Sequence, residues 1–280
     1  MSMPTLVIGK NGKTGRRVDT LLQIAGYRTR AVSRSTDIAF DWQQPEGWLE
    51  AMQGCGSAYV CFQPDLAVPA ASHAIAEFIR LARQAGIRHI VLLSGRGEAG
   101  AQHAERLVMA SGLEWNIVRA SWFAQNFSEG ILIDGVLNGQ VVLPAGDIPE
   151  PFVDTDDIAA VAFACLTQPA LVNQVFEVTG PQLLTLRDCV DVLSDITGNS
   201  IEFVPVSAED FLQGLRQQGQ PEDVLWLMNE LFTVVMDGRN SRVANGVEKA
   251  LGRPATSFRD YALKAARAGA WASPAAVATV

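Results

Sequence analysis

The sequence lacks the marks of several protein classes. None of its apolar runs reaches the roughly 18 residues that span a bilayer, and its first residues show no charged segment followed by a long apolar stretch. Acidic residues outnumber basic ones and give a net charge of -8, which disfavours nucleic-acid binding. We therefore expect a cytoplasmic protein that binds neither membranes nor nucleic acid.

Metal-binding and disulfide patterns are also missing. The 4 cysteines include no C-x-x-C pair, and no histidine stands near them at ligand spacing. The triplet His103-Ala104-Glu105 matches the H-x-E of zinc deaminases, but the P-C-x-x-C that completes their motif does not follow. The sequence predicts no metal site and cysteines that act as small buried residues.

Short apolar runs alternate with helix-length segments in the first part of the chain. The runs cover residues 5–8, 30–33, 58–62, 89–93 and 116–118, and the segments between them cover residues 14–25, 48–53, 69–85 and 101–111. Continuous apolar strands that alternate with helices are typical of a parallel sheet covered on both faces. The expected fold is α/β, with a doubly wound parallel Rossmann-type sheet.

The pattern changes near residue 150. Strands are expected at residues 152–153, 175–179 and 201–205, with helices at 155–166 and 185–197 and several more up to residue 268. We predict a Rossmann domain over residues 1–150, a smaller, mostly helical substrate-binding region over 151–272 and a flexible tail over 273–280.

A glycine-rich turn follows the first expected strand and opens the first expected helix. Such glycines allow a tight turn, close approach of the backbone to a pyrophosphate, and close helix packing. The helix N-terminus adds N–H groups and positive potential. We predict that a dinucleotide binds here, in contact with Gly9, Asn11, Gly12, Lys13, Thr14 and Gly15.

A second segment, Gly95-Arg96-Gly97-Glu98-Ala99-Gly100, fits G-x-G-x-x-G and also follows an expected strand. Glu98 would bring negative charge to the pyrophosphate, and these folds bind it at the first βα turn. We therefore expect residues 94–100 to form a mobile loop over the nicotinamide or the substrate.

The end of the second expected strand selects the cofactor. NAD enzymes place an acid there for the ribose 2′-OH, whereas NADP enzymes place a cation near the 2′-phosphate. This chain has Ser33-Arg34, with no carboxylate until Asp37, and Lys13 adds a second positive charge. The sequence predicts NADP(H), although Arg34 can also be explained as a solvated surface arginine.

These segments resemble the NmrA-like atypical short-chain dehydrogenases, and among them the ergot-alkaloid reductases (agroclavine and festuclavine dehydrogenases) and their bacterial relatives. The resemblance covers nearly all of residues 5–271. It rests on the glycine turn, Ser33-Arg34, Phe40-Asp41-Trp42, residues 91–94, 119–123, 126–129, 151–153, 156–159 and 180–185, and Phe258-Arg259-Asp260. Ala120 departs from the family, which usually has proline after the arginine. The resemblance implies that Asp41 helps to bind the adenine and that a loop with Cys61, Phe62 and Gln63 lies beside the cofactor.

The Tyr-x-x-x-Lys pair of typical short-chain dehydrogenases is absent. Four residues after Tyr27, Tyr59 and Tyr261 stand Ala31, Gln63 and Ala265, and the motif positions correspond to Ala99 and His103. Hydride addition to a carbonyl creates negative charge that needs a donor, whereas addition to an iminium neutralises a positive charge. The absence favours an imine or iminium substrate, with conjugated C=C or quinone reduction still open.

Two residues are candidates for the chemistry, and several aromatic ones for the pocket. His103 is either a proton donor, a contact of the nicotinamide ribose or an ordinary helical histidine. Ser94 is a candidate catalytic residue and a candidate cofactor contact. The expected pocket comprises Gly95, Trp122, Phe123, Asn126, Phe127 and Phe152. Core packing explains Trp122, Phe123 and Phe127 equally well.

The sequence as a whole predicts an NADP(H)-dependent reductase of a small molecule, monomeric or homodimeric, of the secondary-metabolism kind that the resemblance implies. Two alternatives remain: a non-enzymatic NADP(H) sensor that signals to a partner protein, and an isomerase or cyclase that retains its cofactor.

Overall fold

The computed structural model describes residues 3–144 and 146–272, and these form two compact units, each assembled from separate stretches of chain. Unit 1 contains residues up to 120 together with 155–178 and 245–254. Unit 2 contains residues 121–154 and 179–244 and those from 255 onward. The expected tail, residues 273–280, lies outside the described residues.

The two units therefore differ from the predicted division at residue 150. Residues 155–178 belong to unit 1 because they supply its last strand and a covering helix, while residues 121–150 belong to unit 2. A change of pattern along the sequence marks where the chain leaves a sheet, but it does not reveal that the chain later returns to it.

Unit 1 is built on a six-stranded sheet in the order β2-β1-β3-β4-β5-β7, and every pair of neighbouring strands is parallel. Its strands are β1 (Thr5–Ile8), β2 (Thr29–Val32), β3 (Ser57–Val60), β4 (His89–Gly95), β5 (Glu114–Ala120) and β7 (Gln174–Val178). The central strands are apolar and buried along most of their length, as expected of a sheet covered on both faces.

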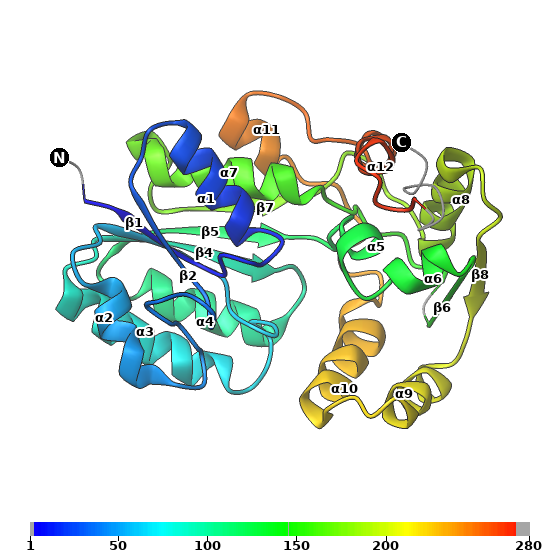
Figure 1. The fold of residues 1–280 in the computed structure, drawn as a ribbon, viewed down its shortest axis with the longest axis horizontal. Helices are drawn as coiled ribbons and strands as arrows, with labels where there is room; N and C mark the ends of the chain where they lie inside the picture. The colour runs from blue at the N-terminus through cyan, green and yellow to red at the C-terminus, as the bar shows by residue number, and fades with distance from the viewer. Residues whose placement is uncertain (1–2, 145, 273–280) are drawn as a thin grey trace. The chain divides into compact units, whose positions relative to one another are not determined.

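Helices cover both faces of this sheet (Figure 1), which confirms the doubly wound fold. One face carries α1 (Gly15–Ile24), α7 (Thr155–Thr167) and α11 (Gly246–Leu251), and the other carries α2 (Trp48–Met52), α3 (Ala71–Ala85) and α4 (Ala99–Met109). Short 3₁₀ turns at Pro45–Gly47 and Pro169–Leu171 complete the unit. Helix α3 illustrates the local signals, since it buries Ile75, Phe78, Ile79 and Ala82 on one side and ends at Gly86 with φ of 84°.

Unit 2 is mostly helical, with one small sheet. Its elements are α5 (Asn126–Glu129), α6 (Ile133–Leu137), β6 (Gln140–Leu143), α8 (Leu186–Thr197), β8 (Glu202–Pro205), α9 (Ala208–Gln217), α10 (Glu222–Asn229), a π-helical turn at Glu230–Val235, and α12 (Phe258–Arg267). Strands β6 and β8 pair in parallel. Strand β6 was not predicted, and residues 152–153, expected as a strand, contribute only a bridge between Val153 and Phe123.

Candidate dinucleotide site

The glycine turn lies where the sequence predicts, between β1 and α1. Gly9 has φ of +85°, and its carbonyl accepts a hydrogen bond from the Gly12 amide at 2.8 Å. The Gly9 amide in turn donates to the Val32 carbonyl at 3.0 Å, which fixes the turn to the end of β2. Arg17 donates to the Lys13 carbonyl at 2.6 Å and to Asp156 of α7 at 2.5 Å, so the first turn of α1 is anchored as well.

The turn fits a dinucleotide because its glycines leave room that side chains would fill. A Cβ on Gly15 would overlap the Gly9 carbonyl, so this glycine is required for α1 to start so close to β1. A Cβ on Gly12 would lie 3.2 Å from the Gly9 oxygen and 3.8 Å from Nε2 of Gln63. No carboxylate lies in residues 9–15, and the helix N-terminus offers its positive potential there.

Polar side chains join this turn to the end of β2. Nδ2 of Asn11 donates to the hydroxyl oxygens of Ser33 at 3.3 Å and Ser35 at 3.1 Å. Arg34 stands between these two serines with an exposed side chain. The segment that carries Arg34 is therefore tied to the glycine turn, and the sequence did not predict this link through Asn11.

The loop that follows β3 borders the same turn. The Thr14 hydroxyl lies 3.9 Å from Sγ of Cys61. Burial raises the pKa of the Cys61 thiol to about 11, and the Thr14 hydrogen bond offsets part of that shift. Trp42 donates to the Cys61 carbonyl at 3.0 Å, and Phe62 is buried. Asp41 accepts from the Gln43 amide at 3.0 Å through its side chain.

The second glycine segment does not form the loop over all of residues 94–100 that we expected. Strand β4 continues through Gly95 and α4 begins at Ala99, which leaves three residues between them. The side chains of Arg96 and Glu98 are buried. A Cβ on Gly95 would overlap the carboxyl group of Glu98, and one on Gly100 would overlap the Ala67 carbonyl. Here the glycines make room for the protein's own atoms.

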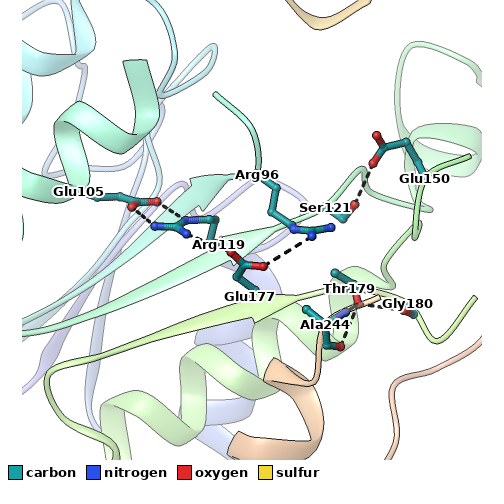
Figure 2. A network of polar contacts seen from close by, with 9 residues as sticks. All are labelled: Arg96, Glu105, Arg119, Ser121, Glu150, Glu177, Thr179, Gly180 and Ala244. Carbon is teal, nitrogen blue, oxygen red and sulfur yellow. Dashed lines mark hydrogen bonds and ion pairs between the residues drawn. The ribbon is translucent and has the colours of Figure 1, made fainter. Parts of the chain in front are cut away.

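A partly buried charge network lies at the carboxyl ends of three neighbouring strands, and the sequence did not predict it (Figure 2). Arg119 of β5 pairs with both oxygens of Glu105 on α4 and with Glu177 of β7 at 3.1 Å. Arg96 approaches Glu177 at 3.5 Å. The hydrogen bond to Glu105 raises the pKa of Arg119 above its ordinary value, so this guanidinium stays charged.

The two candidate catalytic residues lie in different environments. Ser94, at the end of β4, is buried and donates its hydroxyl to Oε1 of Glu105 at 2.6 Å. His103 is exposed on α4, and its Nδ1 lies 3.4 Å from a guanidinium nitrogen of Arg106. Within the H-x-E triplet, it is the glutamate that lies in the buried polar network.

The candidate aromatic residues lie in unit 2. Phe127 and Phe152 are buried and pack edge-on against Phe258, with ring centroids 5.4 and 6.0 Å away, which is the core-packing alternative. Trp122 is half-buried against Phe232 at 5.3 Å, and Phe123 is also half-buried. Asn126, half-buried, opens α5.

Unit 2 also has buried polar groups of its own. The Ser121 hydroxyl donates to Glu150 at 3.4 Å, and the Thr179 hydroxyl donates to the Gly180 carbonyl at 2.9 Å. The same hydroxyl accepts from the Ala244 amide at 3.0 Å. These bonds fix the chain where it enters and leaves the unit.

A parallel, doubly wound sheet with a glycine cradle at its first βα turn defines a Rossmann-type dinucleotide-binding protein. No family model matches the chain. The chain is 29% identical to an NAD(P)H azoreductase of Xenophilus azovorans, over 92% of the chain and 96% of that protein. It is also 29% identical to festuclavine dehydrogenase of Aspergillus fumigatus, over 93% and 97%.

A solved structure with a similar fold is the triphenylmethane reductase of Citrobacter sp., complexed with NADP(H). It has a TM-score of 0.78 and 19% identity, and the match covers 93% of this chain and 99% of the reductase. Together these likenesses confirm the expected resemblance to the ergot-alkaloid dehydrogenases, and the solved structure confirms the fold. They also confirm the class of enzyme, an NADP-dependent oxidoreductase.

No helix in residues 3–144 and 146–272 has the length and apolar character needed to cross a bilayer. Over the same residues, no three His, Cys, Asp or Glu side chains are gathered as metal ligands.

Proposed function

We propose that the protein is an NADPH-dependent reductase whose substrate is a small molecule with an imine, iminium or other conjugated electrophile. The observation that carries the proposal is that no tyrosine of the chain is followed four residues later by lysine; the resemblance assigns the two motif positions to Ala99 and His103, which lie on α4. The protein is thus an oxidoreductase that lacks the usual tyrosine proton donor.

NADPH supplies a hydride, and this chain's residues would bind and orient its carrier. Gly9 and Gly12 would leave the backbone accessible to the pyrophosphate, and Gly15 lets α1 start close to β1, so that its N-terminus would face the phosphate charge. The exposed guanidinium of Arg34 is suited to the 2′-phosphate that distinguishes NADP(H) from NAD(H).

The three tyrosines do not replace the missing acid. Tyr27 precedes β2 and so lies at the amino edge of the sheet, opposite the edge where ligands bind in such folds. Tyr59 is fully buried in β3, and burial raises its pKa well above the ordinary value. Tyr261 is buried in unit 2, where its hydroxyl donates to Ser128 at 2.7 Å.

A cationic electrophile suits such a site for a simple reason. Hydride addition to an iminium carbon cancels the positive charge, so no proton or oxyanion donor is needed in the transition state. Catalysis then consists of holding C4 of the nicotinamide against the carbon of the C=N bond and excluding water. The net charge of -8 also favours the approach of a cation.

The substrate contacts are also part of the proposal. In unit 1, Gly95 ends β4 and would offer its backbone, since the carboxyl group of Glu98 occupies the space where a side chain would lie. In unit 2, Trp122 and Phe123 are half-buried aromatic residues of the kind that bind flat cations, and the half-buried Asn126 would add a polar group.

The test compares two substrates of matching shape, a cyclic iminium and the corresponding cyclic ketone. With NADPH, we expect the iminium to be reduced and the ketone to react about 10²–10³-fold more slowly, the usual loss for one missing oxyanion donor. The ultraviolet absorbance of NADPH follows both reactions. A ketone that reacts as fast as the iminium would contradict the proposal.

His103 provides the second arm of this test. His103→Ala should change iminium turnover by less than about tenfold, because an exposed imidazole would act through positioning rather than proton transfer. If turnover instead falls by several orders of magnitude and a titrating group disappears from the pH–rate profile, His103 is a general acid and the substrate is a carbonyl.

A further inference from the structure

The hydroxyl proton of Ser94 is already engaged within the protein. Ser94 is 4% exposed at the carboxyl end of β4, and its Oγ donates to Oε1 of Glu105 at 2.6 Å. Glu105 is 1% exposed on α4, so water does not compete for this bond. A hydroxyl has one proton and two lone pairs, and the lone pairs of Ser94 are what it has left for a further partner.

Glu105 fixes the direction of the Ser94 hydrogen bond because its carboxylate can only accept hydrogen bonds. Its Oε1 accepts from Nε of Arg119 at 2.9 Å, and its Oε2 accepts from the second guanidinium nitrogen, in a fork-to-fork pair. A protonated Glu105 would aim a donor at these donors, so the pair requires the carboxylate. A carboxylate has no proton to give to Ser94, and the direction of the Ser94 bond is therefore fixed.

The sheet register makes the arrangement rigid. Ser94, Arg119 and Glu177 are direct partners across β4, β5 and β7, so their side chains share one face of the sheet, where α4 brings Glu105. Arg119 joins the two carboxylates, and Arg96 approaches the far one at 3.5 Å (Figure 2). Two arginines and two glutamates balance in charge.

We propose that Glu105 is a positioning residue that makes Ser94 a hydrogen-bond acceptor for the nicotinamide half of the cofactor, through a ribose hydroxyl or the carboxamide N–H. The carboxyl end of a central strand in a Rossmann sheet is where this half of the cofactor is expected. The inference rests on the proposed use of NADPH. It also removes Ser94 as a proton donor, which fits an electrophile that needs none.

Binding measurements test this without turnover. Ser94→Ala should weaken NADPH binding about 2- to 10-fold, the usual range for one hydrogen bond. It should leave adenosine 2′,5′-bisphosphate unchanged, because that fragment lacks the nicotinamide half. Ser94→Thr keeps the hydroxyl and should retain NADPH affinity. An acetylpyridine analogue, which lacks the amide N–H, separates the two donors: it is sensitive to Ser94→Ala only if the donor is the ribose hydroxyl.

The role of Glu105 is tested by a double-mutant cycle. Glu105→Gln gives Ser94 a competing donor and should weaken NADPH binding as Ser94→Ala does. The double variant should lose no more than Ser94→Ala alone, within about twofold, since Glu105 acts through that hydroxyl. Glu177→Gln removes a carboxylate from the same arginine without touching Ser94, and it should leave NADPH affinity unchanged.

Several results would overturn the inference. They are an unchanged NADPH affinity in Ser94→Ala, equal losses for the adenosine fragment, additive losses in the double variant, or an equal loss in Glu177→Gln. Each leaves the proposed function standing as long as NADPH binds and is oxidised. If the unaltered protein does not bind NADPH at all, the proposed function itself fails. Should Glu105→Gln not fold, the Ser94 variants still decide the acceptor role.

Discussion

The two glycine segments of unit 1 match similar patterns but have different surroundings. Residues 9–15 and 95–100 both connect a strand of the sheet to the helix that follows it. Around the first, the side chains are short or cationic, and a Cβ on Gly12 would approach only the Gly9 carbonyl and the tip of Gln63. Around the second, the carboxyl of Glu98 lies against Gly95, and the Ala67 carbonyl lies against Gly100. A glycine pattern thus indicates that other atoms approach the backbone closely. Only the neighbouring side chains and carbonyls show whether those atoms belong to the protein or leave room for a ligand.

Gly12→Val should have the largest effect on cofactor binding. Its side chain would project where the pyrophosphate must approach, so we expect a loss of at least about 100-fold in NADPH affinity, or roughly 2.7 kcal/mol. The fold should survive, because the added Cβ would contact the Gly9 oxygen at 3.2 Å without overlapping it. Isothermal titration measures the affinity and thermal melting the stability.

The matched change in the other segment is Gly97→Ala. Gly97 has φ of +77°, so alanine should cost about 1–2 kcal/mol of stability. NADPH affinity should stay within a few-fold of the parent. If Gly97→Ala loses the cofactor and Gly12→Val does not, the assignment of the two segments must be exchanged.

Gly100→Ala should show the opposite behaviour to Gly12→Val. Its Cβ would overlap the Ala67 carbonyl, and relief of this clash requires α4 to shift. We expect the free energy of unfolding to fall by about 1–3 kcal/mol, as for other overpacked sites. The folded fraction should bind NADPH normally. Chemical denaturation and titration of the same sample would check both statements, and a stable variant with poor binding would disagree with them.

Arg34→Ala should separate the two cofactors. Loss of a charge-assisted contact to the 2′-phosphate should cost about 1.5–3 kcal/mol of NADPH binding. NADH has no such phosphate, so its affinity should barely change. Equal losses for both cofactors would show that Arg34 does not read the phosphate.

The smallest expected effect concerns Cys61, which borders the first segment. Its thiol has a pKa raised to about 11 by burial, so the reactive thiolate is scarce at neutral pH and increases as the pH rises toward that value. Alkylation, followed by mass spectrometry, should be slow at neutral pH, faster in alkali, and slower again with NADPH present. Cys165 of α7, whose pKa is raised to about 12, serves as the control that NADPH should not protect. Rapid labelling of Cys61 at neutral pH, or labelling indifferent to NADPH, would count against a cofactor beside this loop.

Local signals made much of unit 1 predictable from the sequence. The first strand, residues 5–8, was predicted with its observed bounds, and the first three helices were predicted within two residues. Apolar runs, helix periodicity and the glycine at the end of α3 all depend on neighbours along the chain. The glycine turn was found for the same reason.

The features that the sequence did not reveal depend on partners distant in the chain. Ser94, Arg119 and Glu177 become neighbours only through strand register, and Glu105 joins them from a helix. In the sequence, Glu105 is marked only by the H-x-E triplet, and the histidine of that triplet is exposed in the structure. Likewise, the sequence alone assigns Phe127 equally well to a pocket or to the core, and only its packing against Phe258 places it in the core.

Hydride transfer can be traced directly with NADPH that carries deuterium at both C4 positions of the nicotinamide, by following the label to the carbon of a cyclic iminium. If the protein is a reductase that uses a cofactor held on the turn at residues 9–15, the amine product carries deuterium on the former C=N carbon. Gly12→Val then abolishes the transfer, while Gly97→Ala retains it. Product without deuterium, or transfer that survives Gly12→Val undiminished, would contradict the account.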